Sequence, residues 1–127
     1  MPFEIHQKTD PAGIVIVYTG IATGQDIIDA NEKTMDCEAC TYQLSDFTGI
    51  DGFKVSPKEL HKIAIQDCSI PLHYKLEKMA LVGNKQKYAR LADLYYTFVE
   101  IWVGKQRQYE TRTFDTIEEA RQWIGLK

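Results

Sequence analysis

The run Ile14-Val15-Ile16-Val17-Tyr18 decides how this chain folds. Four β-branched residues and one aromatic residue follow each other without a polar break, so a strand formed here has no face suited to water. Such a strand lies inside a sheet that is covered on both faces. We therefore predict a central strand over residues 14–18 and look for its neighbours on either side.

Alternating and apolar segments predict four further strands. Residues 3–7 alternate as a half-buried strand, and the turn Asp10-Pro11-Ala12-Gly13 joins them to the central one. Later strands are predicted over residues 41–48, 78–83 and 108–114. The last of these mixes Tyr and Thr with Glu and Arg, which is typical of an edge strand protected by charge.

Start and stop signals predict four helices between these strands. The first begins at Thr23-Gly24-Gln25-Asp26 and runs to about Asp36, and the second begins at Ser56-Pro57-Lys58-Glu59 and ends before Pro71. A long helix follows over residues 85–103, and the last one runs from Asp115 to near Gly125. Single helices between strands favour parallel pairing, so we predict an α/β fold with a mixed, largely parallel five-stranded sheet and four helices.

Size and composition indicate one folded domain over residues 1–127. Hydrophobic residues make up 44% and charged residues 26%, as in globular proteins. The net charge is -3 with Lys and Arg dispersed, so nucleic acid is not an expected partner. We expect no integral membrane segment and a cytoplasmic location, because neither a secretion leader nor about 18 consecutive apolar residues occur.

The three cysteines and three histidines suggest no catalytic or metal site. Cys37 and Cys40 have the spacing of a redox pair or zinc half-site, but they follow the predicted end of a helix, where the dipole disfavours a thiolate. A zinc ion would need two more ligands, and the remaining candidates are scattered, namely His6, His61, Cys68 and His73. We therefore expect reduced thiols, no metal, no cofactor and no catalysis.

The predicted third helix has more apolar surface than one contact with a sheet requires. One stripe contains Tyr88, Leu91, Ala92, Tyr95, Phe98, Val99 and Trp102. Leu94 and Ile101 lie roughly opposite this stripe, with Tyr96 on its flank. A neighbouring helix or loop can cover these three residues, they can form an interface for a protein partner or a second copy, or they can line a pocket for an apolar ligand.

Several segments together resemble the SpoIIAA-like domains, which belong with the STAS (sulfate transporter and anti-sigma factor antagonist) fold and are compared with the CRAL-TRIO lipid-transfer domain. They are Gly20 with Thr23 and Asp26, Leu44-Ser45-Asp46, Met79-Ala80-Leu81-Val82-Gly83, and Thr113-Phe114-Asp115-Thr116-Ile117-Glu118-Glu119-Ala120-Arg121-Gln122-Trp123-Ile124. The resemblance spans nearly the whole chain. It implies a bacterial-type cytoplasmic domain without catalysis, and it brings no established ligand.

The resemblance also implies a candidate phosphoacceptor. In the anti-sigma antagonist branch a Ser at the start of the second helix is phosphorylated, and the matching position is Ser56. This chain has Ser56-Pro57-Lys58 where that branch has an Asp-Ser-Ser-Gly type of run. Helix capping alone accounts for a Ser at this position.

The sequence thus predicts a non-enzymatic binding or regulatory domain that acts through protein contact, with Leu94, Tyr96 and Ile101 as its surface. The alternative is a carrier of a small lipid or other apolar ligand in a pocket beneath the third helix.

Overall fold

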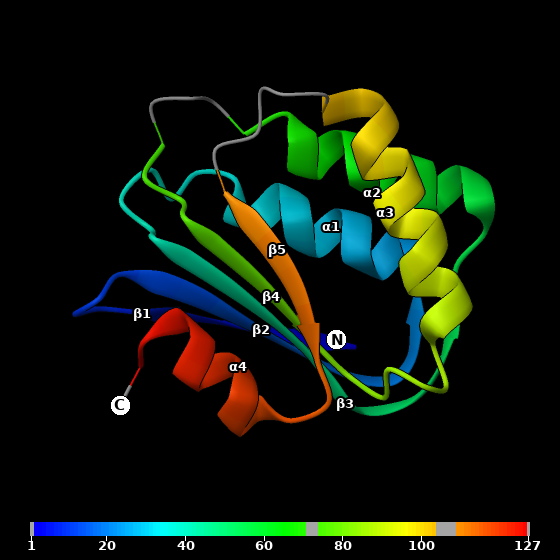
Figure 1. Cartoon of the computed structure of the whole chain (residues 1–127), viewed down its shortest axis with the longest axis horizontal. Coiled ribbons are helices and arrows are strands. Elements are labelled where there is room, and N and C mark those ends of the chain that lie inside the picture. Colours follow the sequence, from blue (N-terminus) through cyan, green and yellow to red (C-terminus); the bar gives the residue numbers. More distant parts are fainter. Residues whose placement is uncertain (1, 71–73, 104–108, 127) are drawn as a thin grey trace.

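The computed structural model describes residues 2–70, 74–103 and 109–126, with only the backbone of residues 100–103. It confirms the predicted order of strands and helices (Figure 1). The elements are β1 (Phe3–Lys8), β2 (Gly13–Thr23), α1 (Gly24–Thr34), β3 (Tyr42–Lys54), α2 (Pro57–Cys68), β4 (Lys78–Val82), α3 (Ala89–Val103), β5 (Glu110–Phe114) and α4 (Ile117–Ile124).

The sheet has five strands in the order β1-β2-β3-β4-β5. β1 pairs antiparallel with β2, and all later pairs are parallel, as the sequence predicts. Ile14, Ile16 and Tyr18 of β2 are buried on one face, and Val15 packs in the core of the other face. The apolar run of β2 therefore lies inside the sheet, and β5 forms an edge, both as expected.

The helices divide unequally between the two faces of the sheet. Because each parallel strand is added on the same side of the one before, right-handed crossovers place α1, α2 and α3 on one face. α4 follows the last strand and packs on the other face, against β4 and β5 (Figure 1). α1 packs on β2, whereas α3 packs on α2 rather than directly on the sheet.

The predicted starts of α1 and α2 are confirmed by their capping bonds. Thr23 and Asp26 form a reciprocal capping box at α1, and Ser56 and Glu59 form another at α2. α4 ends at Gly125, whose φ of 94° is a left-handed conformation that suits glycine. α3 begins at Ala89, later than expected, because residues 85–88 form a turn.

β2 and β3 are both longer than the sequence predicts. β3 was expected to end at residue 48, but it continues to Lys54, because residues 49–54 pair with residues 19–23 of β2. The register shifts at two places in this pairing, one of them after Gly20, which has a φ of 67°. Gly49, Asp51 and Gly52 are typical of turns, so only the partner strand makes this segment extended.

The expectation of reduced thiols is wrong for two of the three cysteines. Cys37 and Cys40 form a disulfide, with their Cα atoms 5.5 Å apart. That separation lies within the range that a disulfide requires. The dipole of α1 affects the reactivity of a thiolate, but it does not decide whether the two residues meet. The loop after α1 brings them together. Cys68 lies half-buried in α2.

Candidate functional site

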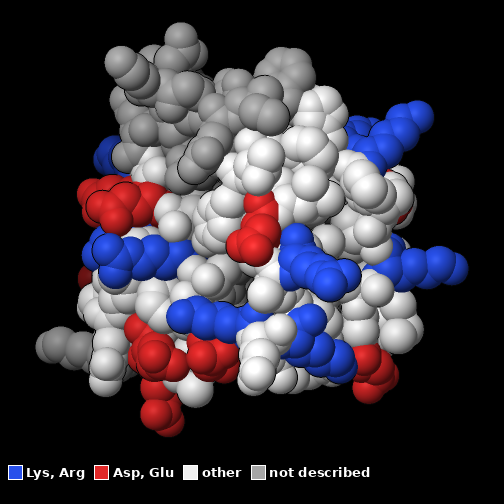
Figure 2. All heavy atoms as spheres, turned by 45° about the vertical axis from the view of Figure 1, so that its right-hand side comes forward, with Lys and Arg blue, Asp and Glu red and all other residues white. Residues whose placement is uncertain are grey.

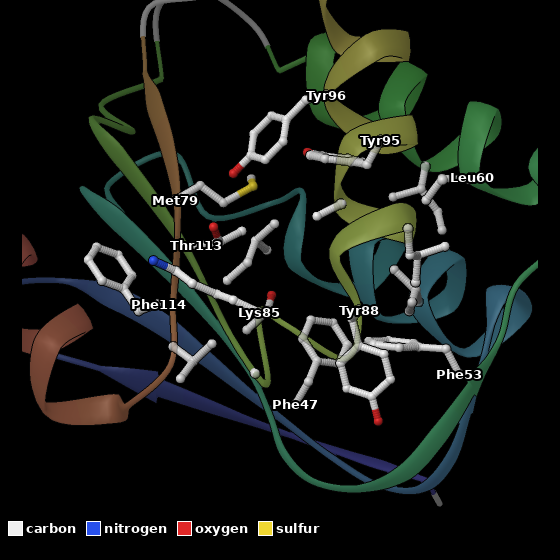
Figure 3. Close-up of a pocket in the computed structure, with 18 of the residues that line it drawn as sticks. Phe47, Phe53, Leu60, Met79, Lys85, Tyr88, Tyr95, Tyr96, Thr113 and Phe114 are labelled. Atoms are coloured by element: carbon white, nitrogen blue, oxygen red, sulfur yellow. The ribbon is translucent and has the colours of Figure 1, made fainter.

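A cavity of about 350 Å³ lies between α3 and the sheet, and we call it the α3 cavity (Figure 3). It exists because α3 packs on α2 and leaves part of β3, β4 and β5 uncovered by helix. Its volume is within the range of small-molecule sites, roughly 300 to 1,000 Å³.

The floor of the cavity is formed by alternate side chains of three neighbouring strands. Gln43 and Ser45 come from β3, Met79 and Leu81 from β4, and Thr113 from β5. In the parallel register Ser45 lies beside Leu81, and Leu81 lies beside Thr113. An apolar strip on β4 is therefore flanked by polar side chains on both sides.

The walls of the cavity are largely aromatic. Tyr95 and Tyr96 project from α3, Tyr88 projects from the turn before it, and Phe47 and Phe53 project from β3 (Figure 3). The ring centroids of Phe53 and Tyr88 are 4.6 Å apart, and those of Phe47 and Phe53 are 5.0 Å apart. Phe53 reaches the cavity only because β3 extends past its predicted end, so the sequence analysis missed it.

A buried carboxylate closes one end of the cavity. Asp67 of α2 is 7% exposed, and its side chain accepts hydrogen bonds from the Tyr95 hydroxyl and, at 3.4 Å, from the Asn31 amide. The Tyr109 hydroxyl donates to the backbone carbonyl of Asp67. A buried charge needs such partners. This network ties together α1, α2, α3 and the start of β5.

The same carboxylate acts on Tyr18 in the adjoining core. Burial raises the pKa of the Tyr18 hydroxyl well above its usual range, and the negative charges of Asp67 and Asp26 raise it further. Tyr18 is therefore neutral over the whole physiological range.

The structure describes the side chains of two of the three candidate surface residues on α3. Leu94 is half-buried and packs against the core between α2 and α3. Tyr96 is also half-buried and lines the α3 cavity, while its ring contacts that of Tyr95 at 5.5 Å. The side chain of Ile101 lies outside the described residues. The structure therefore directs two of the three residues inward.

Ser56 is exposed at the first turn of α2, as the sequence predicts. Its hydroxyl accepts a hydrogen bond from the Glu59 amide at 3.1 Å. Ser56 does not line the α3 cavity, so phosphorylation and ligand binding would involve separate places.

The described histidines and acidic residues do not assemble into a metal site. No group of three or more His, Cys, Asp and Glu side chains is placed to hold an ion within residues 2–70, 74–99 and 109–126. The His61 ring lies 5.1 Å from that of Phe98, and His73 lies outside the described residues.

Figure 2 shows Lys and Arg side chains interspersed with Asp and Glu side chains over one face. Of the helices that the structure describes, none is long and apolar enough to cross a membrane.

Among solved structures, the architecture is similar to that of a protein with a known fold but no assigned activity. That protein, from Shewanella loihica PV-4, is an uncharacterised member of the DUF3478 family with a SpoIIAA-like fold, and the TM-score is 0.55 at 17% identity. The similarity covers 96% of this chain and 91% of that one. No protein-family model and no curated protein matches the sequence. The chain therefore has a SpoIIAA-like fold, which the sequence analysis predicted.

Proposed function

We propose that this SpoIIAA-like domain is a non-enzymatic binding domain that holds a small, mostly apolar molecule in the α3 cavity. The observation that supports the proposal is the cavity itself, with aromatic walls from α3 and β3 around an apolar strip of β4. Mostly apolar clefts and cavities with a few polar groups are the usual form of small-molecule sites. The sequence predicts this function as the alternative to protein contact.

The polar groups of the cavity favour binding over catalysis. The charged side chains among its described lining are Asp67, Asp93 and Lys85. Asp67 is engaged by Tyr95 and Asn31, and neither a His nor a Cys belongs to that lining. Nucleophilic or acid–base catalysis requires a nucleophile or a proton carrier that contacts the substrate.

Burial of an apolar ligand by itself gives weak affinity. Each buried CH₂ group contributes about 0.8 kcal/mol, so about ten carbons contribute roughly 8 kcal/mol. Loss of translational and rotational freedom opposes this by at least about 4 kcal/mol. The remaining binding free energy, at most about 4 kcal/mol, corresponds to a dissociation constant of about a millimolar.

The test is binding of a fluorescent apolar probe, anilinonaphthalene, to the wild type and to two matched variants. Ala92 of α3 lines the cavity, so Ala92→Leu should fill part of it and weaken probe binding at least tenfold. Thr97 is exposed on the same helix, so Thr97→Leu adds the same side chain outside the cavity and should bind normally. Unchanged binding by Ala92→Leu would refute the proposal.

Protein contact through Leu94, Tyr96 and Ile101 remains a second prediction, as does the cytoplasmic location. Light scattering separates the two functions. A monomer that binds the probe supports the cavity, whereas a dimer that Leu94→Asp dissociates, and that binds no probe, supports the contact surface.

A further inference from the structure

We propose that the molecule in the α3 cavity is uncharged and carries a hydroxyl or carbonyl oxygen, which the hydroxyls of Ser45 and Thr113 recognise. This inference rests on the proposed function. It adds the chemical class of the ligand and the residues that select it.

The first observation is an unused hydroxyl on the cavity floor. Ser45 is only 5% exposed and lines the cavity, yet its hydroxyl makes no hydrogen bond with any residue that the structure describes. This hydroxyl is reached from the cavity, so its partner there is water or a ligand. A ligand that fills the cavity is placed to replace the water.

The second observation is a matching polar group on β5. Thr113 lines the floor without a hydrogen bond to the described part of the chain. In Figure 3 Thr113 lies with Met79 and Tyr96 around the same space. Two residues earlier on the same face, the Thr111 hydroxyl is buried without a hydrogen-bond partner among the described residues, but it does not line the cavity. The floor therefore has one such hydroxyl on β5 and one on β3.

The register of the strands gives the spacing of these groups. Ser45, Leu81 and Thr113 lie side by side on three adjacent strands. Neighbouring strands are about 4.8 Å apart, so the backbones of Ser45 and Thr113 are separated by about 10 Å. A ligand with its apolar body over Leu81 can place an oxygen at either edge of that body.

The charges around the cavity disfavour an ionic ligand. Asp67 is buried and lines the cavity, so an anionic head on the floor would be repelled through a medium of low dielectric constant. Hydrogen bonds from Tyr95 and Asn31 already stabilise its carboxylate, so a cationic head is not required. Lys85 and Asp93 also line the cavity, but both are exposed, and water screens their opposite charges. Hydroxyl groups both donate and accept, which suits an uncharged oxygen.

The test compares four probes with the same bicyclic body: naphthol, methylnaphthalene, naphthoate and naphthylmethylammonium, all as the β-isomers. Isothermal calorimetry at neutral pH should show naphthol binding roughly three- to tenfold more tightly than methylnaphthalene, as expected for one net hydrogen bond. Both ionic probes should bind more weakly than naphthol. Because naphthol is the better hydrated of the two uncharged probes, hydrophobicity alone would give the opposite order.

Variants assign the preference to the named hydroxyls. Ser45→Ala and Thr113→Val remove each hydroxyl with little change in volume, and the double variant should lose the preference for naphthol while it still binds methylnaphthalene. Thr97→Val, at an exposed site on α3, should keep the preference. If the double variant does not fold, the two single variants provide the same comparison.

The outcomes separate the two proposals. If none of the four probes binds, the proposed function fails. If the probes bind but naphthoate or the ammonium probe is tightest, or the double variant still prefers naphthol, the inference about the ligand is wrong and the binding function stands.

Discussion

The helices on the two faces of the sheet pack at different distances from the strands. On one face Ala80 of β4 and Ala120 of α4 are fully buried, so α4 lies close to the strands. On the other face Tyr95 of α3 and Tyr88 of the preceding turn line a cavity, which separates that helix from the same strands. Small side chains allow close packing, whereas large rings over a partly polar floor do not. One sheet thus forms a closely packed layer on one side and a cavity on the other.

The support of each helix explains the difference further. Lys78 donates to the Trp123 carbonyl at 2.7 Å and lies over the Trp123 ring, which holds α4 directly to β4. α3 instead depends on α2, where Tyr95 and Val99 pack with Leu60. The position of α3 over the cavity is therefore fixed by α2 and not by the sheet.

The largest effect on stability is expected from a larger side chain on the closely packed face, which α4 covers. Ala120→Leu should lower the free energy of unfolding by about 2 kcal/mol, because no space exists for the added carbons. Urea denaturation measures the change. Gln122→Leu, at an exposed site of α4, should change it by less than about 0.5 kcal/mol. Equal effects would show that α4 is not closely packed.

The next effect concerns the network that holds α3 on α2. Tyr95→Phe removes the hydroxyl that donates to Asp67 and should lower the free energy of unfolding by about 1.5 kcal/mol. Tyr88→Phe, at the cavity wall, is the matched control and should have little effect. If both variants lose the same stability, the Asp67 network does not fix the position of α3.

The free energy of unfolding at alkaline pH tests the packing around Tyr18, on the face of the sheet that α1 covers. Because the pKa of Tyr18 is raised in the folded state, ionisation favours the unfolded chain, and stability present below about pH 10 is lost as pH rises further. The loss approaches about 1.4 kcal/mol per pH unit. Tyr18→Phe should remove most of it, leaving the smaller contribution of Tyr42, whose pKa burial also raises and Arg121 lowers. An unchanged slope would contradict burial of Tyr18.

A smaller effect is expected at the start of α2, which supports α3. Ser56→Ala removes the capping bond and should lower the free energy of unfolding by about 1 kcal/mol, whereas Ser56→Asp should retain most of it. Thermal unfolding measures both. If Ser56→Asp is instead the less stable variant, a phosphate at Ser56 would also be unfavourable.

The smallest effect is expected in the cavity. Ala92→Leu should change the free energy of unfolding by less than about 0.5 kcal/mol, because the cavity accommodates the added carbons. The contrast with Ala120→Leu measures the difference between the two faces directly. A loss of about 2 kcal/mol in both variants would indicate that the cavity has no space for the added carbons in solution.

Much of the fold could be predicted because its signals are local. The apolar run at β2 and the capping residues Ser56 and Glu59 act through neighbouring backbone groups, so they can be recognised one segment at a time. The site could be predicted only in outline. Tyr96 was expected at an apolar surface or pocket, but Phe53 was not, because Gly49 and Gly52 precede it and the segment becomes a strand only beside β2.

The sequence by itself determined the order and direction of the strands and helices and the starts of α1 and α2, since these follow from local hydrogen bonds and from apolar periodicity. The ends of β2 and β3 depended on the pairing between them. Only the tertiary structure decided that α3 leaves a cavity, that Asp67 joins three helices, and that Cys37 meets Cys40. These features depend on the volumes and positions of side chains from distant segments, and no local pattern encodes how such side chains fit together.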